Sequence, residues 1–251
     1  MTDFSYQLYS SRNFTPLSNT FAMLADLGYK SVEGYGGLYA SKAAIEGLTV
    51  DLADSGLTMP TTHMDLTLIE SEPGQVIEIA NLLGIKSIFV PHLAADQRPT
   101  DADGWRAFGK RLQAAGKPLC DGGIAFGWHN HDFEFSTLPT GELPIDLIFE
   151  GGSLLHWEAD IAWIARGGKE PQDYIEKYRD RLTAAHIKDI APEGEKVDED
   201  GWADVGDGTM DWPAIMAALR KTKAEAFVME HDNPSDDRRF AERSLKAAKQ
   251  F

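Results

Sequence analysis

The sequence predicts a (β/α)8 TIM barrel that forms a single domain over residues 1–251. Two observations support this prediction. Short apolar runs alternate eight times with longer amphipathic segments, and a chain of 251 residues has the usual length of one such barrel. Repeated strand-then-helix units imply parallel strands joined by right-handed crossovers, and eight such units close naturally into a barrel.

An open doubly wound α/β sheet is the alternative fold for the same alternation. Such a sheet normally carries a glycine-rich phosphate loop after its first strand. Residues 8–16 occupy that position here and read LYSSRNFTP, a segment without glycine. The closed barrel is therefore the favoured fold.

Helix-end signals separate the predicted elements. Gly28, Gly56 and Gly84 each follow a helical segment, where a left-handed residue commonly ends a helix. We expect Asp211 to cap the helix that has Pro213 in its first turn. The predicted strands cover residues 4–9, 31–35, 57–63, 87–92, 124–130, 154–160, 183–188 and 226–231. The predicted helices cover residues 16–27, 41–54, 73–83, 103–120, 144–150, 171–179, 211–221 and 235–249.

The net negative charge of the chain makes nucleic acids and anionic membranes unexpected binding partners. Lys and Arg number 24 against 40 Asp and Glu, so the formal net charge is −16. Nucleic acids and anionic membranes require clustered positive charge on the protein that binds them. We therefore expect neither of these partners, and the acidity itself is read as a contribution to solubility.

The sequence gives no indication of export. The first ten residues, MTDFSYQLYS, lack a basic segment followed by an apolar run, and no stretch approaches the length of a membrane span. A cytoplasmic location is the expectation. The single cysteine, Cys120, cannot form an internal disulfide and is predicted to be a small core residue at the end of a helix.

Four polar residues lie at or just beyond the ends of successive predicted strands: Glu134, Asp160, His186 and Glu230. The carboxyl ends of barrel strands carry the active site. Three carboxylates and one imidazole form a mostly hard, oxygen-rich ligand set, which suits Mn²⁺ or Mg²⁺. The spacing thus predicts one divalent metal bound by these four side chains.

Strand alternation indicates which of these side chains point into the barrel. His156, Glu158 and Asp160 share one face of their strand. The same rule places His186 with Lys188, and Glu230 with Val228. Glu134 is the exception, because alternation places it opposite His129 and His131. A bulge or a position beyond the regular strand would be needed to bring Glu134 to the site.

Further polar residues at strand ends are candidates for contact with a substrate. Lys188 is expected to bind a substrate oxygen or to pair with Asp160 or Glu158. His129, His131 and His156 are interpreted mainly as hydrogen-bonding groups around the ligands. The residues predicted to contact substrate are Glu33, His63, His92, His131 and Lys188.

The segment 189–210 is long and has no strand or helix pattern. Loops of this length in compact domains are usually either functional or disordered. Trp202 and the Gly206–Gly208 turn favour some order. We therefore expect this segment to be a lid or an oligomer contact.

Several motifs follow one another in a specific order: SVEGYG (31–36), HNHDFEF (129–135), EADIAWI (158–164), HIKD (186–189), VGDGTMDW (205–212) and VMEHD (228–232). With these motifs the chain resembles the sugar phosphate isomerase/epimerase branch of the xylose isomerase-like TIM-barrel superfamily. This set of motifs is specific for the superfamily, but it gives only a weak indication of the substrate.

The resemblance implies roles for the four strand-end residues. In that family a Glu, an Asp, a His and a second Glu bind one divalent metal, and these fall on Glu134, Asp160, His186 and Glu230. Mn²⁺ is favoured, with Mg²⁺, Co²⁺ and Zn²⁺ as alternatives. In the family's ketose 3-epimerases the two glutamates are also the acid/base pair, so the resemblance implies that Glu134 and Glu230 are catalytic.

The chain departs from those epimerases where a histidine often follows the metal-binding aspartate by three residues, since Trp163 stands there. It also has two histidines close to the first glutamate. No cluster of Arg or Lys marks a phosphate pocket in the sequence, which favours an unphosphorylated sugar, cyclitol or keto-sugar. A backbone nest at Gly206–Gly208 is the alternative site for a phosphate.

The leading hypothesis is a metal-dependent isomerase or epimerase of a ketose or keto-sugar that acts through an enediolate. A lyase on the same barrel, either a dehydratase or a β-eliminating enzyme of a 3-keto-glycoside, is the alternative. An endonuclease of the related abasic-site class is disfavoured by the charge of −16. A non-catalytic barrel and homo-oligomerisation both remain open at this stage.

Overall fold

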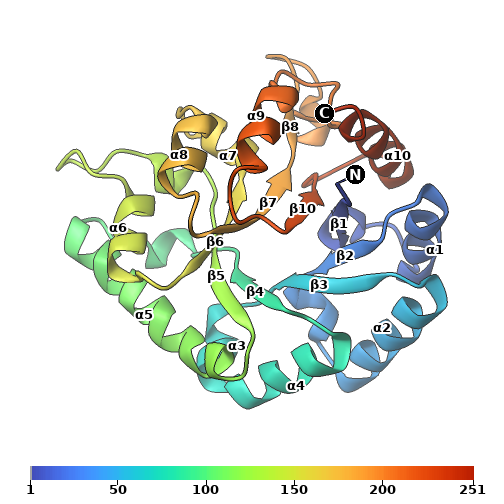
Figure 1. Cartoon of the computed structure of the whole chain (residues 1–251), viewed down its shortest axis with the longest axis horizontal. Helices are drawn as coiled ribbons and strands as arrows, with labels where there is room; N and C mark the ends of the chain where they lie inside the picture. Colours follow the sequence, from blue (N-terminus) through green and yellow to red (C-terminus); the bar gives the residue numbers. More distant parts are fainter. Residues whose placement is uncertain (1) are drawn as a thin grey trace.

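The predicted barrel is confirmed. The computed structural model describes residues 2–251, and eight parallel strands close in the order β1-β10-β7-β6-β5-β4-β3-β2. Figure 1 shows these strands at the centre with the helices arranged around them. The barrel strands are β1 (Ser5–Gln7), β2 (Ser31–Gly34), β3 (Thr58–His63), β4 (Ser87–Val90), β5 (Ala125–His129), β6 (His156–Asp160), β7 (Leu182–Ile187) and β10 (Ala226–Met229).

All eight predicted helices are present, with ends that differ by only a few residues. They are α1 (Leu17–Leu27), α2 (Lys42–Ser55), α4 (Pro73–Leu83), α5 (Ala102–Asp121), α6 (Pro144–Gly151), α8 (Pro171–Lys177), α9 (Trp212–Leu219) and α10 (Asp237–Ala248). Two helices of six residues each, α3 (Leu66–Ser71) and α7 (Ile161–Arg166), were not predicted. They are too short to show a helical period in the sequence.

Short 3-10 helices complete the connections between strands and helices. They are η1 (Leu8–Ser11), η2 (Gly36–Tyr39), η3 (Ala95–Gln97), η4 (Phe133–Phe135) and η5 (Val197–Glu199). Four of them follow a barrel strand directly or within a few residues, and thus shape the end of the barrel where active sites form.

The predicted helix ends have the expected geometry. Gly28, Gly56 and Gly84 are left-handed, with φ of 97°, 70° and 75°, and each ends its helix. A residue with a Cβ would be strained there. The Asp211 side chain accepts a hydrogen bond from Ala214 N and caps the first turn of α9, which also contains Pro213.

Strand alternation divides β6 as predicted. Trp157 points outward and packs near Phe149 of α6 and Tyr178, with ring centroids 5.9 Å and 5.7 Å away. Glu158 and Asp160 are buried on the opposite face, inside the barrel. Apolar side chains thus fill the layer between strands and helices, while the interior at the carboxyl ends of the strands is polar.

The contact between α5 and α6 depends on small residues. A Cβ added to Gly109 would lie 2.1 Å from the Ile148 carbonyl oxygen, and one added to Gly151 would lie 2.1 Å from the Arg106 carbonyl oxygen. The two helix backbones therefore approach each other too closely for any side chain at these positions.

The prediction that Cys120 is a core residue is wrong. Cys120 is exposed in the last turn of α5. The neighbouring Leu119 is completely buried and takes the position that faces the barrel. One residue of helical rotation decides between these two faces.

The segment 189–210 is ordered. It contains a two-stranded antiparallel ladder of β8 (Asp189–Ile190) and β9 (Trp202–Ala203). The Asp189 carboxylate accepts hydrogen bonds from the backbone N of Ile190, Gly206 and Met210. These bonds give the segment a fixed conformation. The sequence did not predict it, because the segment has no periodic strand or helix pattern.

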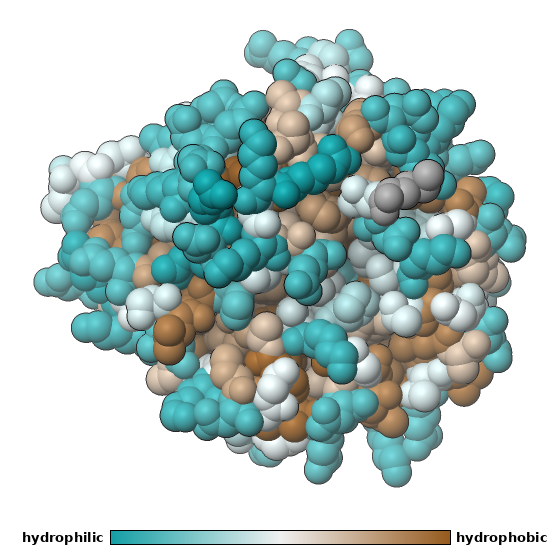
Figure 2. All heavy atoms as spheres, in the orientation of Figure 1, coloured by the Kyte–Doolittle hydropathy of each residue, from teal (hydrophilic) through white to brown (hydrophobic). Residues whose placement is uncertain are grey.

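The outer surface is mostly polar. Figure 2 shows hydrophilic side chains over most of the visible face, with hydrophobic ones in separate small groups. Among residues 2–251, no helix combines the length and apolar character that a membrane span requires.

We predict that Gly109→Ala lowers the free energy of unfolding by about 2–3 kcal/mol, because the new methyl group overlaps the backbone of α6. Gly47 is the matched control, since it lies inside α2 and a Cβ added there would meet open space. Gly47→Ala should stabilise the protein by about 1 kcal/mol. Urea unfolding measures both, and equal effects would contradict the proposed close packing.

Candidate active site

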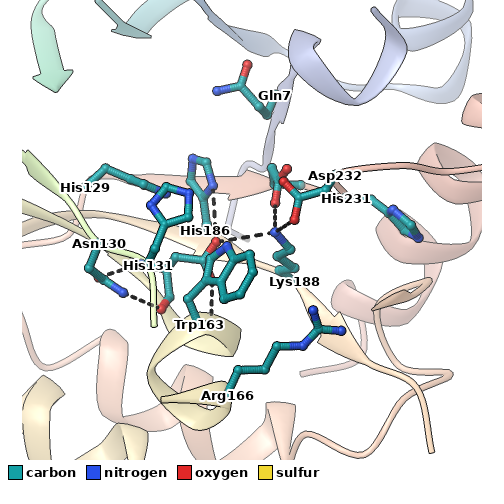
Figure 3. A network of polar contacts seen from close by, with 12 residues as sticks. Gln7, His129, Asn130, His131, Trp163, Arg166, His186, Lys188, His231 and Asp232 are labelled. Atoms are coloured by element: carbon teal, nitrogen blue, oxygen red, sulfur yellow. Dashed lines mark hydrogen bonds and ion pairs between the residues drawn. The ribbon is translucent and has the colours of Figure 1, made fainter. Parts of the chain in front are cut away.

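The polar interior of the barrel opens into a cavity of about 360 Å³ at the carboxyl ends of the strands. This volume is near the lower end of the usual range for small-molecule sites. Figure 3 shows its central polar network, in which His129 and His131 lie on one side and Lys188 and Asp232 on the other. The cavity is lined by Gln7, Tyr9, Tyr35, Gly36, His63, Pro91, His92, His129, His131, Asp160, Trp163, His186, Lys188, Glu230 and Asp232.

The deeper part of this network consists of Glu33, His63, His129 and Glu158, which we call the inner group. Glu158 Oε2 lies 2.5 Å from His63 Nε2 and 3.0 Å from His129 Nδ1. Glu33 Oε1 accepts a hydrogen bond of 2.7 Å from Gln7 Nε2. One oxygen of each carboxylate is thus bonded, whereas Glu33 Oε2 and Glu158 Oε1 are buried without a hydrogen-bond partner among the described residues.

Burial and charge set the protonation of the inner group. Burial raises the pKa of Glu33, but the nearby His63 and His186 outweigh it and lower that pKa to about 2. Burial and the negative charge of Glu33 raise the pKa of Glu158 well above its usual value. Burial lowers the pKa of His63 to about 4. At neutral pH Glu33 is therefore ionised and His63 is neutral, while the environment of Glu158 favours its protonated form.

His186 joins the inner group to a second set of residues nearer the cavity. Its Nε2 lies 2.7 Å from Glu33 Oε1, and its Nδ1 lies 3.8 Å from Asp160 Oδ2. The ionised Glu33 carboxylate is an acceptor only, so Nε2 carries the proton of this bond. In the neutral imidazole, Nδ1 then has a free lone pair on the side of Asp160. Burial lowers the pKa of His186, but the charges of Glu33, Glu230 and Asp160 outweigh it and raise that pKa, so a cation bound at Nδ1 would displace a proton.

Asp160, His186 and Glu230, which we call the outer group, can offer one donor atom each within 4.8 Å of one another. Asp160 Oδ2, His186 Nδ1 and Glu230 Oε2 are all buried. Among the described residues, Asp160 Oδ2 and His186 Nδ1 have no hydrogen-bond partner, and Glu230 Oε2 contacts the ammonium of Lys188 at 2.8 Å. Buried polar atoms normally have partners. These converging donor atoms fit a bound cation.

The charge around the outer group also fits a cation. Lys188 Nζ lies 2.8 Å from Glu230 Oε2 and 3.8 Å from Asp160 Oδ2, and it also pairs with Asp232. One ammonium therefore faces three carboxylates. Burial and the Asp232 charge raise the pKa of Glu230 to about 8. A bound divalent ion would favour the ionised form of Glu230 and balance the charge of the three carboxylates.

A second set of donor atoms, from His63, His129, Glu158 and His186, is equally compact. In this set the atoms have partners already, since Glu158 Oε2 contacts both His63 Nε2 and His129 Nδ1. A metal here would have to replace these hydrogen bonds. The outer group therefore fits a metal better than the inner group does.

Lys188 is completely buried and packed against aromatic rings. Its ammonium lies 3.9 Å from the centre of the Trp202 ring and 5.0 Å from that of Trp163. Burial disfavours its charge, but Asp232 and Glu230 raise its pKa above the ordinary value. Lys188 is thus a fixed positive charge at the cavity wall.

Glu134 does not lie with the outer group. It is in η4, beyond the end of β5, and its carboxylate accepts hydrogen bonds from Trp128 Nε1 and His131 N at 2.8 Å and 3.0 Å. Trp128 points outward from the barrel, as alternation requires. Glu134 therefore holds the turn that presents His131, and it does not line the cavity.

The other expected contact residues lie at different depths. His63 and His131 line the cavity, whereas Glu33 is buried beneath it. His92 is exposed at the rim, and its ring lies 5.5 Å from that of His131. His156 is at the start of β6, below the site.

Trp163 and Trp202 form one wall of the cavity region. Trp163 stands at the position where the resemblance led us to look for a histidine, and its ring lies 4.8 Å from Trp202 and 5.3 Å from His131. An aromatic surface thus replaces a metal ligand or proton donor at this point. The change is consistent with the packing of Lys188 on the same two rings.

Asp232 had no predicted role in the site, and Glu158 and His129 were predicted only as groups that accompany the ligands. Alternation could have identified Asp232, because it has the same parity as Glu230 and follows it by two residues. The direct ion pair of Asp232 with Lys188 could not be predicted, because it depends on how β7 and β10 lie side by side.

A buried ion pair fixes the segment that carries Trp202. Glu199 accepts hydrogen bonds from Ser235 N and from Arg239 at 2.6 Å and 2.8 Å. Arg239 also pairs with Asp204 at 3.0 Å. The segment is thus attached to the start of α10. The expectation of a lid or an oligomer contact stays a prediction. The segment holds Trp202 against Lys188 and Trp163, which line the cavity.

The chain belongs to the family described as xylose isomerase-like TIM barrel, whose model matches residues 21–251. This result agrees with the resemblance inferred from the motifs. The search of curated proteins finds no match.

Solved structures with the same fold include three informative neighbours. A sugar phosphate isomerase/epimerase from Parabacteroides distasonis has a TM-score of 0.82 at 20% identity, over 98% of this chain and 94% of that one. The probable 3-DHS dehydratase AsbF from Bacillus anthracis has a TM-score of 0.78 at 14% identity, over 99% of both chains. The 3-keto-D-glucoside 4-epimerase YcjR from E. coli has a TM-score of 0.73 at 18% identity, over 100% of both chains. At these identities the likeness shows a shared fold.

Glu199→Gln should destabilise the protein by about 1.5–3 kcal/mol at neutral pH, because it removes a buried charge-assisted bond. Burial opposes ionisation, but the Ser235 and Arg239 donors lower the pKa of Glu199 to about 2. A lowered folded-state pKa contributes stability above the unfolded value of about 4.3, and this stability is lost as the pH falls toward 2.

Urea unfolding at several pH values measures this difference. The gap between the wild type and Glu199→Gln should be constant above about pH 5 and should narrow below it. Glu195→Gln, in an exposed part of the same segment, is the control and should have little effect. A gap that does not depend on pH would contradict the role given to the carboxylate.

Glu134→Gln and Glu230→Gln should differ in metal content. Glu230→Gln removes an outer-group carboxylate, so its metal affinity should fall by at least about tenfold, as even changes in groups around a ligand cost about that much. Glu134→Gln should retain the metal, because this side chain bonds Trp128 and His131 instead. Elemental analysis after dialysis measures both, with thermal melting as the check on folding. Equal metal loss in the two variants would contradict this assignment.

Proposed function

We propose that this protein is a divalent-metal-dependent isomerase or epimerase of a ketose or keto-sugar. The observation that carries the proposal is the outer group at a cavity of sugar size: Asp160 Oδ2 and His186 Nδ1 are buried without a hydrogen-bond partner among the described residues, and Glu230 Oε2 pairs with the Lys188 ammonium beside them. Such a site can bind neighbouring oxygens of a sugar and stabilise negative charge on one of them.

Asp160, His186 and Glu230 would hold the ion. Two carboxylates and one imidazole favour a hard cation, and Mn²⁺ is our preferred ion, with Mg²⁺, Co²⁺ and Zn²⁺ as alternatives. When bound, it would polarise the carbonyl and the adjacent hydroxyl of the substrate. The Glu33–His186 bond would orient the imidazole for this role, as is usual for metal-binding histidines.

Lys188 would stabilise the enediolate oxygen. Its ammonium is held between the carboxylates of Glu230 and Asp232 and the ring of Trp202, so it needs no reorganisation during the reaction. Fixed charges of this kind act strongly in a site from which water is excluded. Lys188 thus takes the role of electrostatic stabiliser.

His131 replaces Glu134 in our assignment of proton transfer. His131 lines the cavity on the side away from Lys188, and its Nδ1 is buried without a hydrogen-bond partner (Figure 3). Burial and the Lys188 charge lower the pKa of His131 to about 3, so its imidazole is neutral at physiological pH. The negative charge of a bound enediolate would raise this pKa toward the range of an efficient base. Glu230 and His131 would then exchange the proton beside the carbonyl from two walls of the cavity.

A lyase is the second candidate, because elimination from a keto-sugar passes through the same type of enolate. The probable dehydratase among the structural neighbours shares this fold. Product analysis separates the two reactions, since epimerisation conserves the mass of the sugar and elimination releases water or an aglycone.

The proposal is tested by removing the metal with a chelator, restoring Mn²⁺ and following deuterium exchange from solvent into a panel of ketoses and keto-sugars. We expect exchange only in the restored protein. Lys188→Met should lower the exchange rate by about 10²-fold, as loss of one oxyanion-stabilising group typically does. Exchange that persists without metal, or no exchange with any sugar of the panel, would refute the proposal.

A further inference from the structure

A second cavity, of about 300 Å³, lies beside the first. The two cavities share four lining residues: Gly36, His63, Pro91 and His92. The second lies between the loops that follow β3 and β4, whereas Asp160, Lys188 and Glu230 line only the first. The pocket therefore has a reacting end and an extension.

The walls of the extension combine apolar and polar surface. Leu66 and Leu93 are buried on its inner side. Asp65, Thr67 and Gln97 are exposed along it. The Thr67 hydroxyl and the Gln97 amide form no hydrogen bond with any described residue, so both can bind a ligand. This mixture suits a hydroxylated organic group, which has both hydroxyl and C–H surface.

The extension has no cation available for an anionic group. Arg111 is the one Arg or Lys among its lining residues. Both of its bonds to Glu70 are 2.7 Å long, so its charge is already paired in a bidentate contact. A phosphate or carboxylate would meet no free positive charge there, and it would lie near Asp65. A neutral ligand group fits the extension better.

A substrate that uses both parts must be longer than one sugar ring. The reacting end alone has the volume of a small-ligand site, and its polar groups surround the outer group. A substituent attached to that sugar would pass His63 and His92 to enter the extension.

We propose, on the basis of the function proposed above, that the substrate is a glycoside: its keto-sugar ring binds at the reacting end, and a neutral hydroxylated substituent such as a second sugar binds in the extension. The extension then determines specificity, and the outer group together with Lys188 carries the reaction.

Two tryptophan substitutions test this assignment. Ala94 lines the extension and is exposed, so Ala94→Trp should fill it. Ala95 is the next residue, is also exposed and is not part of the lining, so Ala95→Trp is the matched control. Neither residue touches the reacting end.

Calorimetric titration of the metal-loaded protein measures the effect on binding. The probes are methyl glucoside and three glucose disaccharides of different linkage in their non-reducing, methyl glycoside forms, which lack the reactive keto group. We expect at least one disaccharide to bind the wild type about tenfold more tightly than methyl glucoside. Ala94→Trp should abolish this preference, and Ala95→Trp should retain it.

Equal affinity for all four sugars, no binding of any of them, or the same response in both variants would overturn the inference. This readout does not depend on turnover. A disaccharide preference without any deuterium exchange would refute the proposed reaction and leave the extension in place. Deuterium exchange without a disaccharide preference would refute the role given to the extension and leave the proposed reaction in place.

Discussion

The hydrogen bond between Glu33 Oε1 and His186 Nε2 is the interaction on which the site depends. It places the proton of the imidazole on the inner side and leaves Nδ1 free on the side of Asp160 and Glu230. Glu33 can remain ionised in the barrel interior because His63 and His186 outweigh its burial. Together with the contacts that Glu158 Oε2 makes with His63 and His129, this bond favours a metal at the outer group over one at the inner group.

The surrounding structure holds the charges of the site in place. Lys188 is trapped between carboxylates and the Trp202 ring, and Trp202 belongs to a segment attached to α10 through Glu199 and Arg239. Glu134 fixes the turn that presents His131. A buried charge is costly unless it is paired, so these outer contacts are needed for an acidic site to form inside a folded barrel.

Much of the fold could be predicted because apolar periods and glycine helix ends are local signals. The inward direction of Asp160, His186 and Lys188 follows from the two-residue period of a strand. Glu134 could not be placed in this way, because η4 begins beyond the strand and alternation no longer applies. The inner group and the pocket extension depend on side-chain packing between strands that are far apart in the sequence. No local periodicity in a single sequence predicts such packing.

The position of the metal is the central claim, and anomalous diffraction from crystals grown with Mn²⁺ tests it most directly. We expect one anomalous peak between Asp160, His186 Nδ1 and Glu230. A peak among His63, His129 and Glu158, or one bonded to Glu134, would contradict it.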